Sequence, residues 1–283
     1  MLKMTLILVL AVILLLPMTF GYNYCNNRTH LCELAKWKHF MCRLEDFHAF
    51  GNTKYHAIVP DTAIVRRETL GVINTFRNTF ASGDLTTNEN KTFSSAKRMR
   101  RLNWDSELAY MARTHASTVS FKHSECRSTQ RFPFVGEVLA ILPPQKSKPT
   151  IIDELNKLLT PMFDEYKVVE DPDGLLHAYD PIRDFPASHF TLFVSDRVSR
   201  VGCGITVGSN CNIGHTVGFC HFLTCHFDFN NLAGSYVYKA GKPASGCGDW
   251  NTVGSVKYSH LCANTGDLFP ADRGDDGELH GGS

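Results

Sequence analysis

Two histidines and two glutamates, carried by four separate segments, are the side chains of this sequence best suited to chemistry. They are His123 in FKHSEC, Glu137 in VGE, Glu165 in FDEY and His189 at the start of HFTLF. If folding brings them into one cleft, the imidazoles can bind a divalent cation such as Zn²⁺, and the ion can activate a bound water for hydrolysis. Without a metal, a glutamate can act as a general base. The structural alternative is a hydrogen-bonded cluster in which each imidazole N–H pairs with a carboxylate.

A serine nucleophile is not expected at this cluster. Ser124 and Ser195 lie near the two histidines in sequence, but neither sits in a Gly-x-Ser-x-Gly elbow. A second group of histidines, His215, His221 and His226, is expected on strands or at the surface rather than at a metal. The cysteines near them do not form a Cys-x-x-Cys knuckle, which argues against a thiolate zinc site.

Three helices are predicted between about residues 60 and 166. The first begins near Pro60 and ends at Gly83, because apolar residues recur at helical spacing between them. The second is capped by Asp105, and His115 shares its apolar face. The third begins at Thr150 with a capping-box pattern; Pro161 should break or kink it, with helix resuming over 163–166.

The hydrophobic pattern changes period after the third helix. Short β-like runs follow at His189–Val194, Val201–Val207, His221–Phe229 and Ser235–Tyr238. Helices followed by strands predict an α+β fold. The apolar run Gly136–Pro144 either packs in the core or lines a lipid or sterol groove.

The N-terminus reads as a secretory signal peptide over residues 1–21. The apolar run Thr5–Leu16 follows Lys3 and is too short to cross a bilayer. Removing Lys3 takes the formal charge from +1 to zero, so no electrostatic footprint for nucleic acid or anionic lipid is expected. The one basic cluster, 97–101, is expected to be a solvated surface loop.

The chain contains ten cysteines, an even number that predicts a disulfide framework in an oxidising compartment. Spacing alone leaves the pairing open. Asn27 and Asn90 begin glycosylation acceptor sequences, which predict exposed loops. The tripeptide at 273–275, Arg-Gly-Asp, matches an integrin-type motif, but a match of three residues arises easily by chance.

The four segments resemble, in combination, the signature of the CAP superfamily: cysteine-rich secretory proteins, antigen 5 and pathogenesis-related proteins. The segments Val201–Gly204 and Phe222–Phe227 add to the resemblance, which covers about 62–238 and reaches both ends in the insect antigen 5 branch. It implies a three-layer α-β-α sandwich with a small antiparallel sheet, and it makes His123, Glu137, Glu165 and His189 the family tetrad.

The resemblance also implies a covalent and domain organisation. The expected disulfides are Cys25–Cys42, Cys32–Cys126, Cys203–Cys225, Cys211–Cys220 and Cys247–Cys262. The expected segments are a signal peptide over 1–21, a disulfide-stapled extension over 22–59, a CAP domain over 60–240, a C-terminal extension over 241–269 and a disordered tail over 270–283. Three positions depart from the family pattern: Val119 replaces a cysteine, and Met162 and Ser195 stand where tryptophan is usual. The change at Ser195 predicts a looser wall beyond His189.

The function that the resemblance implies is binding by a secreted, extracellular, monomeric protein. The expected partner is a small hydrophobic ligand, a divalent cation or an extracellular receptor, with no nucleic acid and no transmembrane segment. The cofactor it allows is Zn²⁺ at His123 and His189. No catalytic residue is assigned, and the alternative function is a metal-assisted hydrolase that uses the tetrad.

Overall fold

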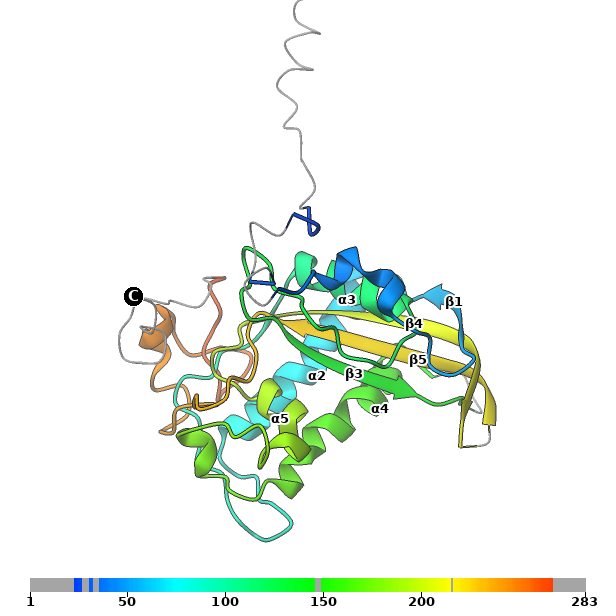
Figure 1. Ribbon diagram of the computed structural model, residues 1–283. Helices are drawn as coiled ribbons and strands as arrows, with labels where there is room; N and C mark the ends of the chain where they lie inside the picture. The colour runs from blue at the N-terminus through cyan, green and yellow to red at the C-terminus, as the bar shows by residue number, and fades with distance from the viewer. Residues whose placement is uncertain (1–22, 27–30, 33–35, 146–148, 215, 267–283) are drawn as a thin grey trace, which may run out of the picture.

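The computed structural model describes residues 23–26, 31–32, 36–145, 149–214 and 216–266 (Figure 1). The expected signal peptide, Asn27, His215 and the tail with its Arg-Gly-Asp tripeptide lie outside these residues. Asn90 lies in an exposed turn with a positive φ of 61°. Within the described segments, no helix is long and apolar enough to span a membrane.

A twisted sheet forms the middle layer, with strand order β1-β4-β5-β3. The strands are β1 (Lys54–Ile58), β4 (Arg200–Ile213), β5 (Thr216–Phe227) and β3 (Gly136–Leu142), and neighbours along this path are antiparallel. A short strand, β2 (Asn103–Trp104), pairs with β4 in parallel. The run Gly136–Pro144 is therefore mostly a core strand rather than the lining of a groove.

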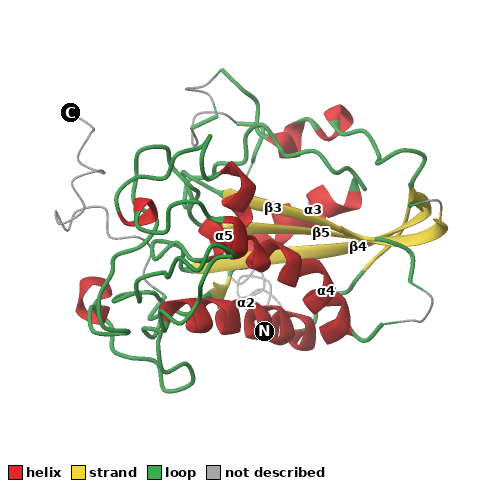
Figure 2. Ribbon diagram, turned by 90° about the horizontal axis from the view of Figure 1, so that it is seen from below, coloured by secondary structure: helices red, strands yellow, loops and turns green. Residues whose placement is uncertain are grey.

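Helices cover both faces of the sheet. Helix α3 (Ser106–Ser117) and the N-terminal extension lie on one face, and α2 (Ala63–Ala81), α4 (Ile151–Phe163) and α5 (Ser188–Phe193) lie on the other (Figures 1 and 2). The predicted α+β sandwich is thus confirmed. The N-caps expected at Asp105 and Thr150 are also present, since each side chain accepts backbone N–H groups of the following turn.

Two glycines of β4 let α3 lie directly on the sheet. A Cβ on Gly202 would lie 2.0 Å from the backbone nitrogen of Ala109, and one on Gly204 would lie 2.5 Å from the Cα of Arg113. Only glycine permits so close an approach. The Gly-Cys-Gly sequence therefore fixes the position of α3, and with it the position of His115 near the end of that helix.

Three element predictions are wrong. His189–Val194 is not a strand but the core of α5, and Ser235–Tyr238 forms a loop. Short apolar runs do not distinguish a buried strand from a buried helix, and the α5 N-terminus is held by a carboxylate distant in sequence. Pro161 does not break α4, which continues to Phe163 and then tightens into a 3₁₀ turn over Asp164–Val168. A proline in the last turn removes only one helical hydrogen bond.

Five disulfides connect the layers and the extensions. They are Cys25–Cys42, Cys32–Cys126, Cys203–Cys225, Cys211–Cys220 and Cys247–Cys262. The Cys203–Cys225 bridge joins paired residues of β4 and β5, and Cys32–Cys126 ties the N-terminal extension to the loop that carries the first histidine.

The basic cluster at 97–101 is not the solvated loop that we expected. Arg98 and Arg100 are 1% and 2% exposed and stack on Trp250, with guanidinium-to-ring distances of 4.6 and 4.2 Å. Arg98 donates to Asp196 at 2.9 Å. The covering residue belongs to the C-terminal extension, about 150 positions away, so local sequence carries no sign of this burial.

Candidate functional site

Glu137 is the centre of the site and is buried at the start of β3. Its preceding residue, Gly136, is packed so tightly that a Cβ there would lie 2.5 Å from the carbonyl oxygen of Phe229. The β3–β5 register pairs Glu137 with His226, so the two side chains emerge on the same face of the sheet. This is the face that α3 covers.

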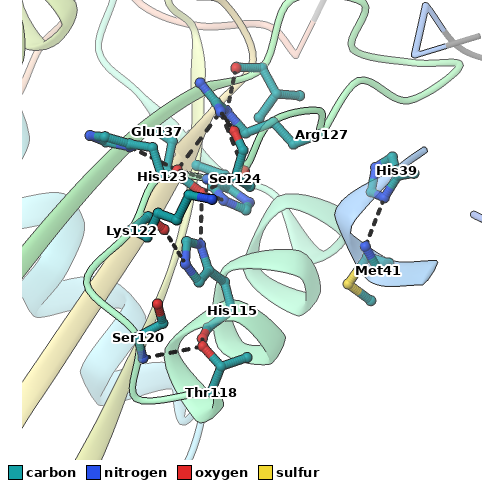
Figure 3. Close-up of polar contacts among 12 residues, drawn as sticks. His39, Met41, His115, Thr118, Ser120, Lys122, His123, Ser124, Arg127 and Glu137 are labelled. Atoms are coloured by element: carbon teal, nitrogen blue, oxygen red, sulfur yellow. Dashed lines mark hydrogen bonds and ion pairs between the residues drawn. The ribbon is translucent and has the colours of Figure 1, made fainter. Parts of the chain in front are cut away.

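Five donors from the described segments reach the Glu137 carboxylate. Oε1 accepts from His123 Nδ1 at 2.8 Å and from the Ser124 backbone N–H at 2.9 Å. Oε2 accepts from His115 Nδ1 at 2.8 Å, His226 Nε2 at 2.9 Å and the Ser124 hydroxyl at 2.9 Å. Figure 3 shows His115 rising from α3 toward Glu137, with His123 and Ser124 beside it.

The electrostatics of the cluster follow from this arrangement. Burial alone would raise the pKa of Glu137, but the charge of Arg127 and the hydrogen bonds from the three histidines hold the pKa well below its ordinary value. The nearest nitrogen of Arg127 lies 3.7 Å from Oε1. Burial lowers the pKa of His226 to about 4, so this ring is neutral near neutral pH. Glu137 is therefore a fixed carboxylate.

A second histidine–carboxylate pair lies at the N-terminus of α5. Glu165 Oε1 accepts from His189 Nδ1 at 2.6 Å, and Oε2 accepts from the backbone N–H groups of His189 and Phe190 at 3.0 and 3.1 Å. The carboxylate thus replaces the missing helical acceptors of the first turn and favours helix there. The same contact fixes the ring of His189.

The two pairs meet at one cleft. Its lining comprises His123, Arg127, Glu137, Tyr179, Pro181, Phe185, Ser188, His189, Leu192, Asn230 and Asn231. The side chains of His123 and His189 are 56% and 29% exposed, whereas that of Glu137 is fully buried. Glu165 contacts His189 from outside this lining. In both rings Nδ1 faces a carboxylate, which leaves Nε2 for a ligand.

Ser195 does not form a wall of this cleft. It is 3% exposed, and its carbonyl oxygen accepts a hydrogen bond from Arg77 at 2.9 Å. The chain turns inward after α5, so the residue lies in the core. The prediction that Ser195 loosens a wall of the cleft is therefore wrong, because the residue does not lie at the cleft.

Sequence reasoning missed His115 and His226. Their ligand atoms and Glu137 Oε2 lie within 4.8 Å of one another, and the group is buried. No group of three potential ligands within the described segments includes both His123 and His189. A signal for His115 did exist, because it falls on the apolar face of its helix. The sequence predicts His226 on a strand or at the surface; it does lie on β5, but it is fully buried, and only the strand register pairs it with Glu137.

Comparisons with known proteins agree with the fold. The chain is 29% identical over 248 residues to Venom allergen-1 of Aedes albopictus, covering 85% of this chain and 87% of that one. It is 31% identical over 196 residues to the Antigen 5 like allergen Cul n 1 of Culicoides nubeculosus, covering 65% and 82%. The crystal structure of NaASP2 with Zn²⁺ matches with a TM-score of 0.56 at 19% identity, covering 72% of this chain and 98% of that one. The model of the cysteine-rich secretory protein family (CAP) matches residues 70–227, so the chain belongs to this family.

Proposed function

We propose that this protein is a secreted CAP-domain binding protein that holds a divalent cation between His123 and His189, and that it is not a hydrolase. The observation that carries the proposal is the state of the two cleft rings. Each keeps Nδ1 on a carboxylate, Glu137 or Glu165, at 2.8 and 2.6 Å. In metal sites, a ligating histidine usually donates its second ring N–H in this way.

These carboxylate contacts fit zinc. A carboxylate that accepts from Nδ1 fixes the proton on that nitrogen and leaves the Nε2 lone pair for a metal. With two imidazoles, the remaining positions on the ion would be open to water or to a ligand's oxygen. The residues would hold the cation and orient it, and the ion would supply a Lewis acid at the floor of the cleft.

The same contacts argue against hydrolysis. A general base must reach a water or substrate proton. Glu137 is fully buried, its two oxygens are occupied by five donors, and its pKa is held well below its ordinary value. Glu165 is likewise occupied by His189 and Phe190. Neither carboxylate has the freedom that the alternative function demands.

Calorimetric titration with Zn²⁺ tests the cation site. We expect weak binding at neutral pH, strongly reduced in His123→Ala and His189→Ala, and released on acidification because a metal-bound imidazole must be neutral. His177→Ala is a control, since this histidine does not line the cleft. Binding that survives both cleft substitutions would place the ion elsewhere. Zinc-dependent peptide or ester cleavage abolished by Glu137→Gln would favour the hydrolase.

A small hydrophobic ligand is a second candidate, favoured by a groove on the other face. The groove lies between α2 and α4 beside the C-terminal extension. Val72, Phe76, Ile152 and Tyr258 give it an apolar part, and Glu68, Thr75, Asn156 and Lys257 give it a polar part. Mass spectrometry of natively purified protein would identify a co-purified lipid. Phe76→Asp should abolish its retention, while His189→Ala should leave it unchanged.

A further inference from the structure

We propose that His115, Glu137 and His226 form a second divalent-cation site. It would be buried between α3 and the sheet and separate from the cleft histidines. The three ligand atoms are His115 Nδ1, Glu137 Oε2 and His226 Nε2, which lie within 4.8 Å of one another. All three side chains are fully buried. Two imidazoles and one carboxylate form a donor set typical of zinc and other first-row divalent metals.

Both ring nitrogens of His115 face oxygen atoms that can only accept. Its Nε2 lies 3.1 Å from the carbonyl oxygen of Lys122, and its Nδ1 lies 2.8 Å from Glu137 Oε2. A carbonyl and an ionised carboxylate can only accept, so neither ring nitrogen can be a bare acceptor. Either both nitrogens carry hydrogen, or Nδ1 binds a metal while Nε2–H donates to the carbonyl. The second arrangement is the usual one for a ligating histidine.

His226 is the third ligand of the proposed site. Its Nε2 points at the same oxygen, at 2.9 Å, while its Nδ1 is buried without a hydrogen-bond partner in the described structure. When Nε2 binds the ion, the single ring hydrogen of a neutral imidazole moves to Nδ1, so ion binding must exceed the cost of an N–H without a partner in the described structure. Both histidines thus direct a nitrogen at Oε2, and an ion bound there would take the place of the hydrogen on His115 Nδ1 and shift that of His226 from Nε2 to Nδ1.

The geometry requires little adjustment to accept the ion. Ligand atoms about 2.0–2.1 Å from a tetrahedral zinc lie about 3.3 Å apart. The separations from Oε2 are 2.8 and 2.9 Å, so the rings would have to withdraw by about 0.4–0.5 Å. Ser124 Oγ, 2.9 Å from Oε2, holds the carboxylate in place.

The surroundings would make this site closed, unlike the cleft. Phe47 packs on the ring of His115 with a centroid distance of 4.7 Å, and Phe40 lies 5.8 Å from both His115 and His226. Both aromatic residues belong to the N-terminal extension. Because these aromatic residues exclude water from the three ligands, we expect the buried ion to couple to folding and to exchange slowly.

Anomalous diffraction from wild-type crystals grown with Zn²⁺ tests the proposal without a variant. We expect a peak between His115 Nδ1, Glu137 Oε2 and His226 Nε2, in addition to any peak at His123 and His189. A peak at the cleft alone, or none in a folded protein, would overturn the buried site and leave a proton as its cation. A peak at the buried site alone would support it and would count against the cleft site instead.

Metal content of matched variants gives an independent readout. After refolding with Zn²⁺ and passage over a chelating column, wild-type protein should retain about one ion per chain at the buried site. His226→Asn, which keeps a polar donor, should lose that ion, and His189→Asn should keep it. Equal retention by His226→Asn and wild type would refute the site. If His226→Asn does not fold, His115→Asn and the wild-type diffraction experiment decide.

Discussion

Two regions of this protein bury charge, and they do so in opposite ways. Around Glu137, one carboxylate is surrounded by three histidines and one arginine, so most of its partners can gain or lose a proton. Around Arg77, a fully buried guanidinium is met chiefly by backbone carbonyls: those of Phe193, Ser195, Val198 and Arg100 lie 2.6–3.1 Å from its nitrogens.

The difference separates a responsive region from a fixed one. Burial lowers the pKa of Arg77 to about 9, with the charge of Arg100 acting in the same direction, so the guanidinium remains charged at and below neutral pH. Backbone carbonyls do not titrate. The arginine region can therefore hold loops together under all acidic and neutral conditions, whereas the histidine region can change with protons or metal.

The largest effect should come from the fixed region. Arg77→Met should lower the free energy of unfolding by about 4–5 kcal/mol, because it removes the donor from several buried carbonyls at once. Urea denaturation at neutral pH measures the loss. The matched control is Arg66→Met on the same helix, where Arg66 is 42% exposed and pairs with Asp61 at 2.7 Å. Arg66→Met should change the free energy of unfolding far less, because an exposed ion pair contributes little in water. Similar losses in the two variants would mean that burial of Arg77 is not what matters.

Glu137→Gln should have a somewhat smaller effect. It should lower the free energy of unfolding by about 3–4 kcal/mol at neutral pH, because Arg127 and the histidines lose their buried anion. The sign of the pH dependence follows from the lowered pKa. The contribution of Glu137 is complete above the ordinary carboxyl pKa of 4.5 and is lost as the pH falls toward the lowered folded-state value. The gap between wild type and variant should therefore be constant above about pH 5 and narrow below it.

Urea denaturation over a pH series, with a chelator present, measures that gap. Glu125→Gln is the control on the same loop, because Glu125 is 69% exposed and lies 3.8 Å from Lys122. It should change stability little at any pH. A gap that widens on acidification would contradict the charge state that we assign to Glu137.

Sequence reasoning could reach the fold because the family signature and local helix signals agree. Asp105 and Thr150 are N-cap residues that indicate where their helices begin. The glycines of Gly202-Cys203-Gly204 allow α3 to lie close to the sheet. It failed at Ser188–Phe193, where a helix depends on Glu165, a residue more than twenty positions away. Periodicity over six residues cannot register such a contact.

The site was only partly within reach for a related reason. The resemblance names His123, Glu137, Glu165 and His189, and the structure brings His123, Glu137 and His189 to one cleft. His226 acquires its role from a β-strand register, and Arg98 acquires its burial from Trp250 in the C-terminal extension. The residues next to His226 and Arg98 in the sequence give no signal of either contact. Non-local pairing therefore decides which polar side chains are buried.

The smallest of the three effects should be the acid sensitivity contributed by His226. Its pKa falls from an ordinary 6.5 to about 4 in the folded protein, so between these values the unfolded chain binds the extra proton and acidification favours unfolding. One pH unit corresponds to about 1.4 kcal/mol, so between pH 6.5 and 4 the free energy of unfolding can fall by at most about 3 kcal/mol. We expect a fall of about 2–3 kcal/mol. With a chelator present, His226→Asn should flatten the stability curve over this interval, whereas exposed His48→Asn should not. Arg77→Met should lower the whole curve yet keep the wild-type slope, because Arg77 stays charged throughout the interval. If the stability of His226→Asn depends on pH as steeply as that of the wild type, then His226 does not resist protonation in the folded protein. The contrast between the two regions would then rest on Glu137 alone.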